Sequence, residues 1–251
     1  MQGLTEFLPV SSSGHLVLFS AGLGVEQDGL LFDVAVHVAT LLAVLAFYRI
    51  RVAGLVRGAL RGEAEAWRYG IKLAVATLPA VAAVLLARRF FEGLYESESV
   101  GGVGLGFCFT GAVVYSTRWT LPRAEGAEPG WGAALLIGLA QAVAIVPGIS
   151  RSGTTVALGL ALGIAPAAAA EFSFLMSVPA ILGALVLQLP ELGAASAHAW
   201  AAIGVGVALA LMAGLAALWL FVRLLRGRVF HRFAWYVWPL GVCVLLWTYA
   251  R

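Results

Sequence analysis

Two charged residues lie in apolar stretches, and each has serines beside it. Glu6 precedes the polar run 11–14, and Arg151 lies inside the polar run 150–153. A charge at membrane depth costs about 2.5–3.5 kcal/mol and marks a functional site by default. Arginine forms paired hydrogen bonds with phosphate oxygens, and a carboxylate can hold a Mg²⁺ ion that bridges to the same phosphate. These residue types predict a phosphate-binding centre.

Hydroxyl groups and glycines surround both charges. Helices that restart after a break direct free N–H groups toward an anion, and glycine lets a ligand approach the backbone closely. Ser12 with the nearby His15 would supply a nucleophile and a proton shuttle. The expected phosphate-binding residues are Ser11, Ser13, Ser150, Ser152, Thr154 and Thr155. Two alternatives stay open: some hydroxyls only cap helices, and Glu6 and Arg151 form a purely structural ion pair.

The two polar runs belong to segments that resemble each other. At a constant offset of 139, the first segment matches the second at Gln2 and Gln141, Ser11 and Ser150, Ser13 and Ser152, and Gly14 and Gly153. Chance similarity between apolar stretches is the alternative. Inverted repeats with broken helices place the working site where the breaks meet, near the membrane midplane. The repeat therefore predicts that Glu6 and Arg151 lie together.

The composition is that of an integral membrane protein. Of the 251 residues, 61% are hydrophobic and 12% are charged, whereas soluble domains carry about 25% charged residues. This excludes a soluble enzyme and a nucleic-acid-binding module. The two cysteines, Cys108 and Cys243, lie in apolar runs and imply no disulfide or metal site.

Six apolar stretches approach or reach the roughly 20 residues that span a bilayer. They cover residues 31–48, 69–87, 100–117, 170–189, 199–222 and 233–250. Two further stretches, 2–24 and 131–164, are interrupted by proline and serine and are predicted to form re-entrant helical hairpins. We therefore expect an all-α polytopic protein, one integral membrane domain over residues 1–251. Its inverted repeats would cover approximately residues 1–120 and 131–251.

Basic residues predict the orientation in the membrane. The segments 49–72, 118–130 and 223–232 contain 12 of the 16 basic residues, which the positive-inside rule places in the cytoplasm. The segment 190–198 has no lysine or arginine, and only Arg88 and Arg89 run against the rule. The first hairpin then opens outward, so the active site is expected on the external side.

Three further ionisable residues lie in or beside predicted spans. Asp33 and His37 are four residues apart, on one face of the first span. We expect His37 to pair with Asp33 across the turn, and we leave Asp33 as a candidate for the site. Glu171 begins a later span and is interpreted as an interfacial residue.

Two motifs resemble the signatures of a known family. The segments QGLTEFLPVSSSGH (residues 2–15) and PGISRSGTT (residues 147–155) resemble those of the undecaprenyl-pyrophosphate phosphatase family, and the likeness extends over essentially the whole chain. Members are enzymes of the bacterial plasma (inner) membrane. They use a divalent cation to dephosphorylate the C55 lipid pyrophosphate released by cell-wall synthesis. High levels of these enzymes confer bacitracin resistance.

The resemblance implies a role for each matching residue. Gln2 and Glu6 fill a Glu/Gln-x-x-x-Glu pattern and would bind the cation, Mg²⁺ or Ca²⁺. Ser12 matches a proposed nucleophile, His15 a nucleophile or acid–base group, and Arg151 the arginine that holds the phosphates. Gln2 replaces a carboxylate found in many members, which leaves more of the cation binding to Glu6.

Two function classes are compatible with this sequence. The first is a phosphatase acting on a polyprenyl pyrophosphate, and the alternative is a lipid-phosphate transporter or flippase of inverted-repeat architecture. The serine, histidine and carboxylate favour the phosphatase, because transport does not require them. The expected partners are the lipid substrate and the bilayer, with no nucleic acid, and a homodimer is left open.

Overall fold

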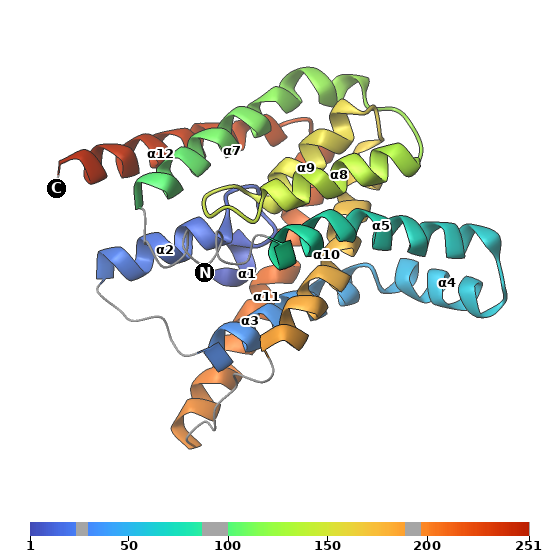
Figure 1. The fold of residues 1–251 in the computed structure, drawn as a ribbon, viewed down its shortest axis with the longest axis horizontal. Helices are drawn as coiled ribbons and strands as arrows, with labels where there is room; N and C mark the ends of the chain where they lie inside the picture. The colour runs from blue at the N-terminus through green and yellow to red at the C-terminus, as the bar shows by residue number, and fades with distance from the viewer. Residues whose placement is uncertain (24–29, 87–99, 189–196, 251) are drawn as a thin grey trace.

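The computed structural model describes residues 1–23, 30–86, 100–188 and 197–250. These residues form helices joined by short turns, with no β-strand among them (Figure 1). Long apolar runs favour helices in lipid because a helix satisfies its own backbone hydrogen bonds. The all-α prediction is therefore confirmed for the part of the chain described.

Each predicted span corresponds to one long helix. These are α3 (Leu30–Phe47), α5 (Ala64–Leu86), α7 (Val100–Thr120), α10 (Pro166–Gln188), α11 (Ala197–Arg226) and α12 (Ala234–Tyr249). By length and composition α5, α7, α10 and α11 can cross a membrane, and α3 together with α4 (Arg49–Leu60) makes a possible fifth span. The 16 residues of α12 are fewer than the roughly 20 that a perpendicular span needs.

The bend between α3 and α4 is a feature that hydropathy did not predict. The two helices meet at 77°, and Tyr48 at the junction has φ −95° and ψ 19°, outside the helical region. Arg51 of α4 donates to Glu171 of α10 at 2.8 Å and also pairs with Glu128. Glu171 also accepts from the Tyr69 hydroxyl at 3.3 Å, so it joins α4, α5 and α10 and is more than an interfacial residue.

Both interrupted stretches fold as a helix, a break and a second helix. The first contains α1 (Gln2–Thr5) and α2 (Ser12–Leu23), and the second contains α8 (Trp131–Val143) and α9 (Arg151–Ala161). In the first break, Ser11 has a left-handed backbone with φ 65°, which is uncommon outside glycine. In the second, the same left-handed region is occupied by Gly148 with φ 90°.

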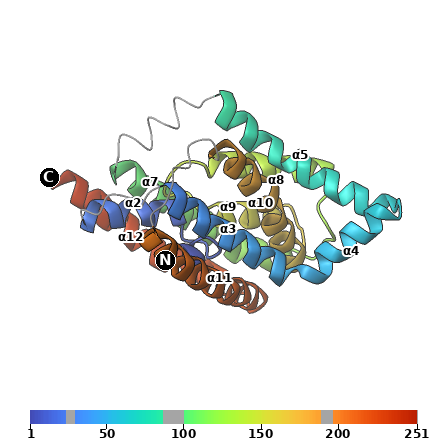
Figure 2. The ribbon, with the colours of Figure 1, turned by 90° about the horizontal axis from the view of Figure 1, so that it is seen from below.

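The helices pack in pairs that join distant parts of the sequence. α7 lies along α12, α3 along α11 and α5 along α8 (Figures 1 and 2). Small residues allow close approach, as is common between helices in lipid. Gly138 of α8 lies so close to α5 that a Cβ there would be 2.3 Å from the Ala76 carbonyl oxygen. This packing fixes the start of the second break against α5.

An aromatic row anchors the first break in the core. Phe7 contacts Phe174 of α10 with ring centroids 5.7 Å apart, Phe174 contacts Phe221 of α11 at 4.9 Å, and Phe221 contacts Phe230 at 5.0 Å. All four side chains are fully buried. Phe7 follows Glu6 directly, so this row also fixes where Glu6 lies.

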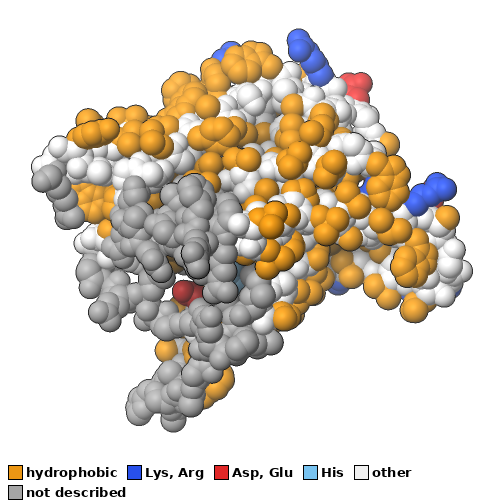
Figure 3. Space-filling model, viewed as in Figure 1, with side chains coloured by type: hydrophobic (Ala, Val, Ile, Leu, Met, Phe, Trp, Pro, Cys, Tyr) orange, Lys and Arg blue, Asp and Glu red, His pale blue; other side chains and the backbone are white. Residues whose placement is uncertain are grey.

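The outer surface is largely apolar. Figure 3 shows hydrophobic side chains spread over the described part of one face, with most of the visible Lys and Arg side chains toward its margins. Exposed side chains of this kind include Leu78, Leu105, Leu139, Leu209 and Leu246. A surface this apolar suits contact with lipid and not with water.

Candidate active site

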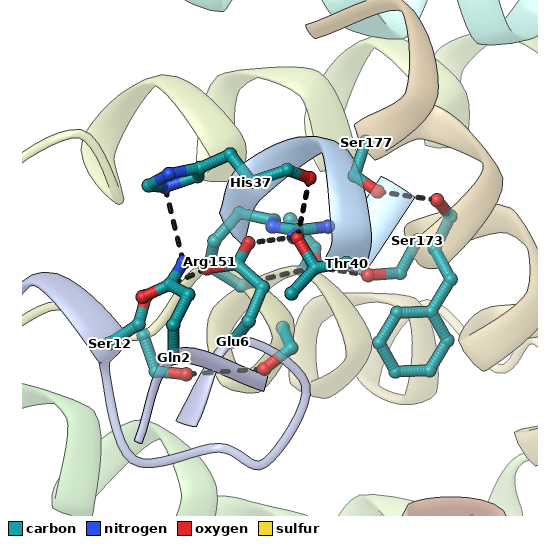
Figure 4. Close-up of polar contacts among 12 residues, drawn as sticks. Gln2, Glu6, Ser12, His37, Thr40, Arg151, Ser173 and Ser177 are labelled. Atoms are coloured by element: carbon teal, nitrogen blue, oxygen red, sulfur yellow. Dashed lines mark hydrogen bonds and ion pairs between the residues drawn. The ribbon is translucent and has the colours of Figure 1, made fainter. Parts of the chain in front are cut away.

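The two breaks meet at one ion pair. Arg151 Nη2, at the first turn of α9, donates to Glu6 Oε1 at 2.6 Å, although the residues are 145 positions apart (Figure 4). The side chains are only 16% and 12% exposed. A buried carboxylate and guanidinium each offset the other's loss of hydration. The structure thus brings together the two charges of the sequence pattern.

The second carboxylate oxygen of Glu6 holds the candidate nucleophile. Ser12 Oγ donates to Glu6 Oε2 at 2.8 Å, and Gln2 Nε2 donates to the same oxygen at 3.0 Å. A carboxylate in hydrogen-bond contact with a hydroxyl can accept its proton as the oxygen attacks an electrophile. Glu6 therefore lies between a serine that can attack and an arginine that can hold an anion.

Gln2 is oriented by His37, a residue that the sequence analysis did not assign to the site. His37 Nδ1 lies 2.7 Å from the Asp33 backbone oxygen and Nε2 lies 3.1 Å from Gln2 Nε2. A neutral imidazole with its proton on Nδ1 satisfies both contacts. His37 thus contacts the backbone of Asp33 and in addition joins the site. The side-chain carbonyl oxygen of Gln2, Oε1, is buried and has no hydrogen-bond partner among the described residues.

His15 is not placed beside Ser12 as the proton-shuttle prediction required. Its Nδ1 lies 2.8 Å from the Ser11 backbone oxygen, and its Nε2 lies 2.8 Å from the Tyr236 hydroxyl. The ring stacks on Tyr236 and meets the edge of Phe107. Both ring nitrogens therefore have partners other than Ser12. Tyr236 gave no signal in the sequence because it is one aromatic residue among many on α12.

Most of the predicted phosphate-binding hydroxyls contact the protein itself. Ser11 accepts from the backbone N–H of Gly14 at 3.3 Å, and Ser150 accepts from that of Gly153 at 3.2 Å, so both cap helices. Ser13 and Ser152 each lie 3.3 Å from the capping serine of their own break, and Thr155 contacts Ser173. Thr154 alone of the six has a buried hydroxyl without a partner in the described residues.

Thr110 of α7 holds the second break in place. Its hydroxyl donates to the Gly148 carbonyl oxygen at 2.8 Å and accepts from the Ser150 backbone N–H at 2.9 Å. The side chain is fully buried. Because Arg151 follows Ser150, this contact helps to set the position of the guanidinium. Sequence spacing offers no way to find a threonine that acts from a separate helix.

A divalent cation would find few protein ligands here. Among the described residues, no group of three or more His, Cys, Asp or Glu side chains could hold a metal ion. Gln2 Oε1 is buried without a partner and lies on the residue that contacts Glu6. Mg²⁺ commonly uses one or two protein oxygens and completes its shell with substrate phosphates and water. Gln2 and Glu6 fit such a shared site.

A cavity of about 640 Å³ reaches the ion pair from between α5 and α10. Its polar lining consists of Glu6, Gln141, Arg151 and Ser177. The remaining lining is apolar or glycine: Ala80, Val81, Val84, Leu85, Ala144, Ile145, Ala180, Ile181, Leu182, Gly183 and Val186. Leu85 and Val186 are each 62% exposed, so the outer part of the cavity lies at the apolar surface. A lipid chain can enter there.

Comparison with known proteins identifies the family. A family model described as bacitracin resistance protein BacA matches residues 1–243. This chain belongs to that family. The match confirms the resemblance that the two motifs predicted.

Several members of the BacA family are similar over nearly their full length. A protein named undecaprenyl-diphosphatase from Rubrobacter xylanophilus is 42% identical, and the alignment covers 97% of this chain and 93% of the relative. A protein of the same name from Desulfatibacillum aliphaticivorans is 37% identical, covering 98% and 95%. Undecaprenyl-diphosphatase 2 from Stutzerimonas stutzeri is 41% identical, covering 98% and 94%.

The buried ion pair of this BacA-family site predicts coupled stability. Arg151→Met leaves Glu6 as a buried carboxylate without its guanidinium, and losing one partner of such a pair costs about 3–5 kcal/mol. The double variant Glu6→Gln with Arg151→Met removes both charges and should recover much of that loss. Thermal unfolding in detergent measures both variants and Glu6→Gln alone. Additive losses in the double variant would contradict the coupling.

Proposed function

We propose that this chain is an undecaprenyl-diphosphatase, which hydrolyses the C55 lipid pyrophosphate to the monophosphate carrier and inorganic phosphate. The observation that carries the proposal is the contact of Glu6 with Ser12 on one oxygen and with Arg151 on the other. The names of the relatives support a phosphatase over the lipid-phosphate transporter considered above. The activity serves recycling of the lipid carrier in cell-wall synthesis.

The chain's own residues can perform the transfer in two steps. Ser12 Oγ attacks the terminal phosphorus while Glu6 Oε2, 2.8 Å away, accepts its proton. The bond from that phosphorus to the bridging oxygen breaks, and the lipid monophosphate leaves. Water then attacks the phosphorus of the phosphoserine, and the bond from that phosphorus to Ser12 Oγ breaks as Glu6 returns its proton to Oγ. Both protons of the attacking water stay on the phosphate, which leaves as H₂PO₄⁻. Arg151 stabilises the charge on the phosphoryl oxygens in both steps.

A divalent cation, Mg²⁺ or Ca²⁺, is part of the proposal. Glu6 and the carbonyl oxygen of Gln2 would hold it, together with oxygens of the substrate. When bound, the cation neutralises phosphate charge and polarises the phosphoryl group. His37 contributes by donating to the Asp33 backbone oxygen and accepting from the Gln2 amide nitrogen, which keeps the Gln2 carbonyl oxygen free for this role.

We also propose where the substrate lies in the membrane. The cavity between α5 and α10 would receive the first part of the prenyl chain, and the rest would stay among lipids. Six transmembrane helices with two re-entrant hairpins, α1–α2 and α8–α9, agree with the distribution of basic residues. In this topology the site opens to the external side of the membrane.

Phosphate release by the purified protein tests the function. In detergent, the chain should release inorganic phosphate from a polyprenyl pyrophosphate only when a divalent cation is present. Arg151→Lys should lower the rate by about 10²–10³-fold, because a point charge cannot replace a paired donor in the transition state. Arg118→Lys, at an exposed arginine near the end of α7, is the matched control and should retain full activity. A wild-type protein that releases no phosphate would exclude a phosphatase and favour the transporter.

The attacking group can be identified by trapping. A reaction quenched at alkaline pH, which preserves phosphohistidine, should show phosphate on Ser12 itself when the phosphopeptide, which also contains His15, is fragmented in the mass spectrometer. Ser12→Ala should abolish both the adduct and turnover, because Glu6 then has no hydroxyl to activate. Ser116→Ala is the control, because the Ser116 hydroxyl donates to the Val113 carbonyl oxygen within α7. Phosphate on His15 would contradict this assignment.

Thiol labelling tests the orientation. In a variant with Cys108 and Cys243 replaced by alanine, Ser196→Cys should react with a membrane-impermeant maleimide in intact cells. Glu65→Cys, in the basic segment 49–72, should react only after the cells are lysed. The reverse pattern would place the site on the cytoplasmic side.

A further inference from the structure

Gln141 of α8 is a buried polar residue that neither the ion pair nor the proposed nucleophile uses. Its side chain is 4% exposed, and it lines the cavity together with Glu6 and Arg151. Neither Nε2 nor Oε1 has a hydrogen-bond partner among the described residues. Buried amides are nearly always hydrogen-bonded, so a side chain with both ends unpaired beside a cavity points to a ligand.

The repeat shows why this amide lacks partners. Gln141 matches Gln2 at the offset of 139, and Gln2 donates to Glu6 and to His37. The position that matches Glu6 at this offset is Ile145. The helices that follow the two breaks align at an offset of 140, which places Phe32 on Phe172 and His37 on Ser177. Ile145 and Ser177 both line the same cavity.

Neither of these two residues holds Gln141 as Glu6 and His37 hold Gln2, since Gln141 has no hydrogen-bond partner among the described residues. The side chain of Ile145 has no polar atom. Ser177 donates its hydroxyl proton to the Phe174 carbonyl oxygen at 2.7 Å. The second segment therefore has the matching amide, Gln141, but lacks side chains that hydrogen-bond to it as Glu6 and His37 do to Gln2.

We propose that Gln141 binds the lipid-proximal phosphate, the one esterified to the prenyl chain. This inference rests on the proposed function. The apolar part of the cavity would hold the chain, and Gln141 lies on its polar lining with Glu6 and Arg151. Ser12 contacts Glu6 but does not line the cavity, so the terminal phosphate lies toward Ser12 and the proximal phosphate toward Gln141.

Two donors are available for this phosphate. The Gln141 amide nitrogen can donate to one phosphoryl oxygen. Arg151 Nη1 is buried without a partner in the described part of the chain, and it can donate to another. The monophosphate product keeps the proximal phosphate, so Gln141 binds substrate and product alike. Free inorganic phosphate corresponds to the terminal group and does not need Gln141.

A binding experiment with Gln141→Leu separates binding of the proximal phosphate from binding of the terminal phosphate. The dissociation constant of farnesyl monophosphate, measured on the purified protein, should rise about 10-fold or more, the loss expected for one hydrogen bond to a charged group. KM for farnesyl pyrophosphate should rise by a similar factor, with kcat nearly unchanged. Inhibition by inorganic phosphate should stay as in the wild type. Leu139→Ala, at an exposed position of the same helix, is the matched control and should change none of these values.

Each outcome decides the inference. An unchanged dissociation constant, or a fall in kcat with unchanged binding, would overturn it. Gln141→Glu serves if the leucine variant does not fold; it keeps a polar side chain and should bind the monophosphate even more weakly, because like charges repel. Wild-type binding by Gln141→Glu would also overturn the inference. A wild-type protein that binds farnesyl monophosphate but hydrolyses nothing would reject the proposed function and still permit the Gln141 test.

Discussion

The buried pair of Glu6 and Arg151 is the constraint on which the rest of the site depends. Either charge alone in an apolar interior would be strongly destabilising, so both breaks must reach the same point. Two backbone breaks can meet at membrane depth only where protein covers the backbone N–H and C=O groups that the breaks leave without helical partners. Thr110 does so from α7, and the capping serines Ser11 and Ser150 do so from within the breaks themselves. The local hydrogen bonds and the overall packing therefore support the same contact.

Sequence reasoning identified what repeats or is strongly patterned. Apolar runs gave the long helices, and the matched Ser-x-Ser-Gly segments indicated that Glu6 and Arg151 would meet. The bend at Tyr48 was missed because hydropathy shows whether a segment is apolar but not the direction in which its helix runs. His37 and Tyr236 were missed as partners of Gln2 and His15, because those contacts are hydrogen bonds between residues 35 and 221 positions apart. Hydrogen bonds of this kind leave no pair of opposite charges and no spacing signal in a single sequence.

The two halves share a framework but divide the chemistry between them. Ser11 and Ser150 make the same cap, each with a second serine at 3.3 Å. The position that matches Glu6 is Ile145, and the one that matches Arg151 is Ser12, so each half supplies groups that the other lacks. The two capping serines differ in backbone, since Ser11 has a φ of 65° and the matching Ser150 a φ of −76°. Two breaks with matching serine caps thus hold an asymmetric site, as directed attack on one of two phosphates requires.

The position of the cavity determines how such a substrate can reach the site. Moving a C55 chain from lipid into water would cost roughly 40 kcal/mol at about 0.8 kcal/mol per carbon, far more than any binding site could return. The prenyl chain therefore cannot pass through the aqueous phase and must stay in apolar surroundings throughout. The exposed side chains Leu85 of α5 and Val186 of α10 lie where the cavity meets the apolar surface. The headgroup alone then needs to enter, and Glu6, Gln141 and Arg151 supply the polar groups that replace its water.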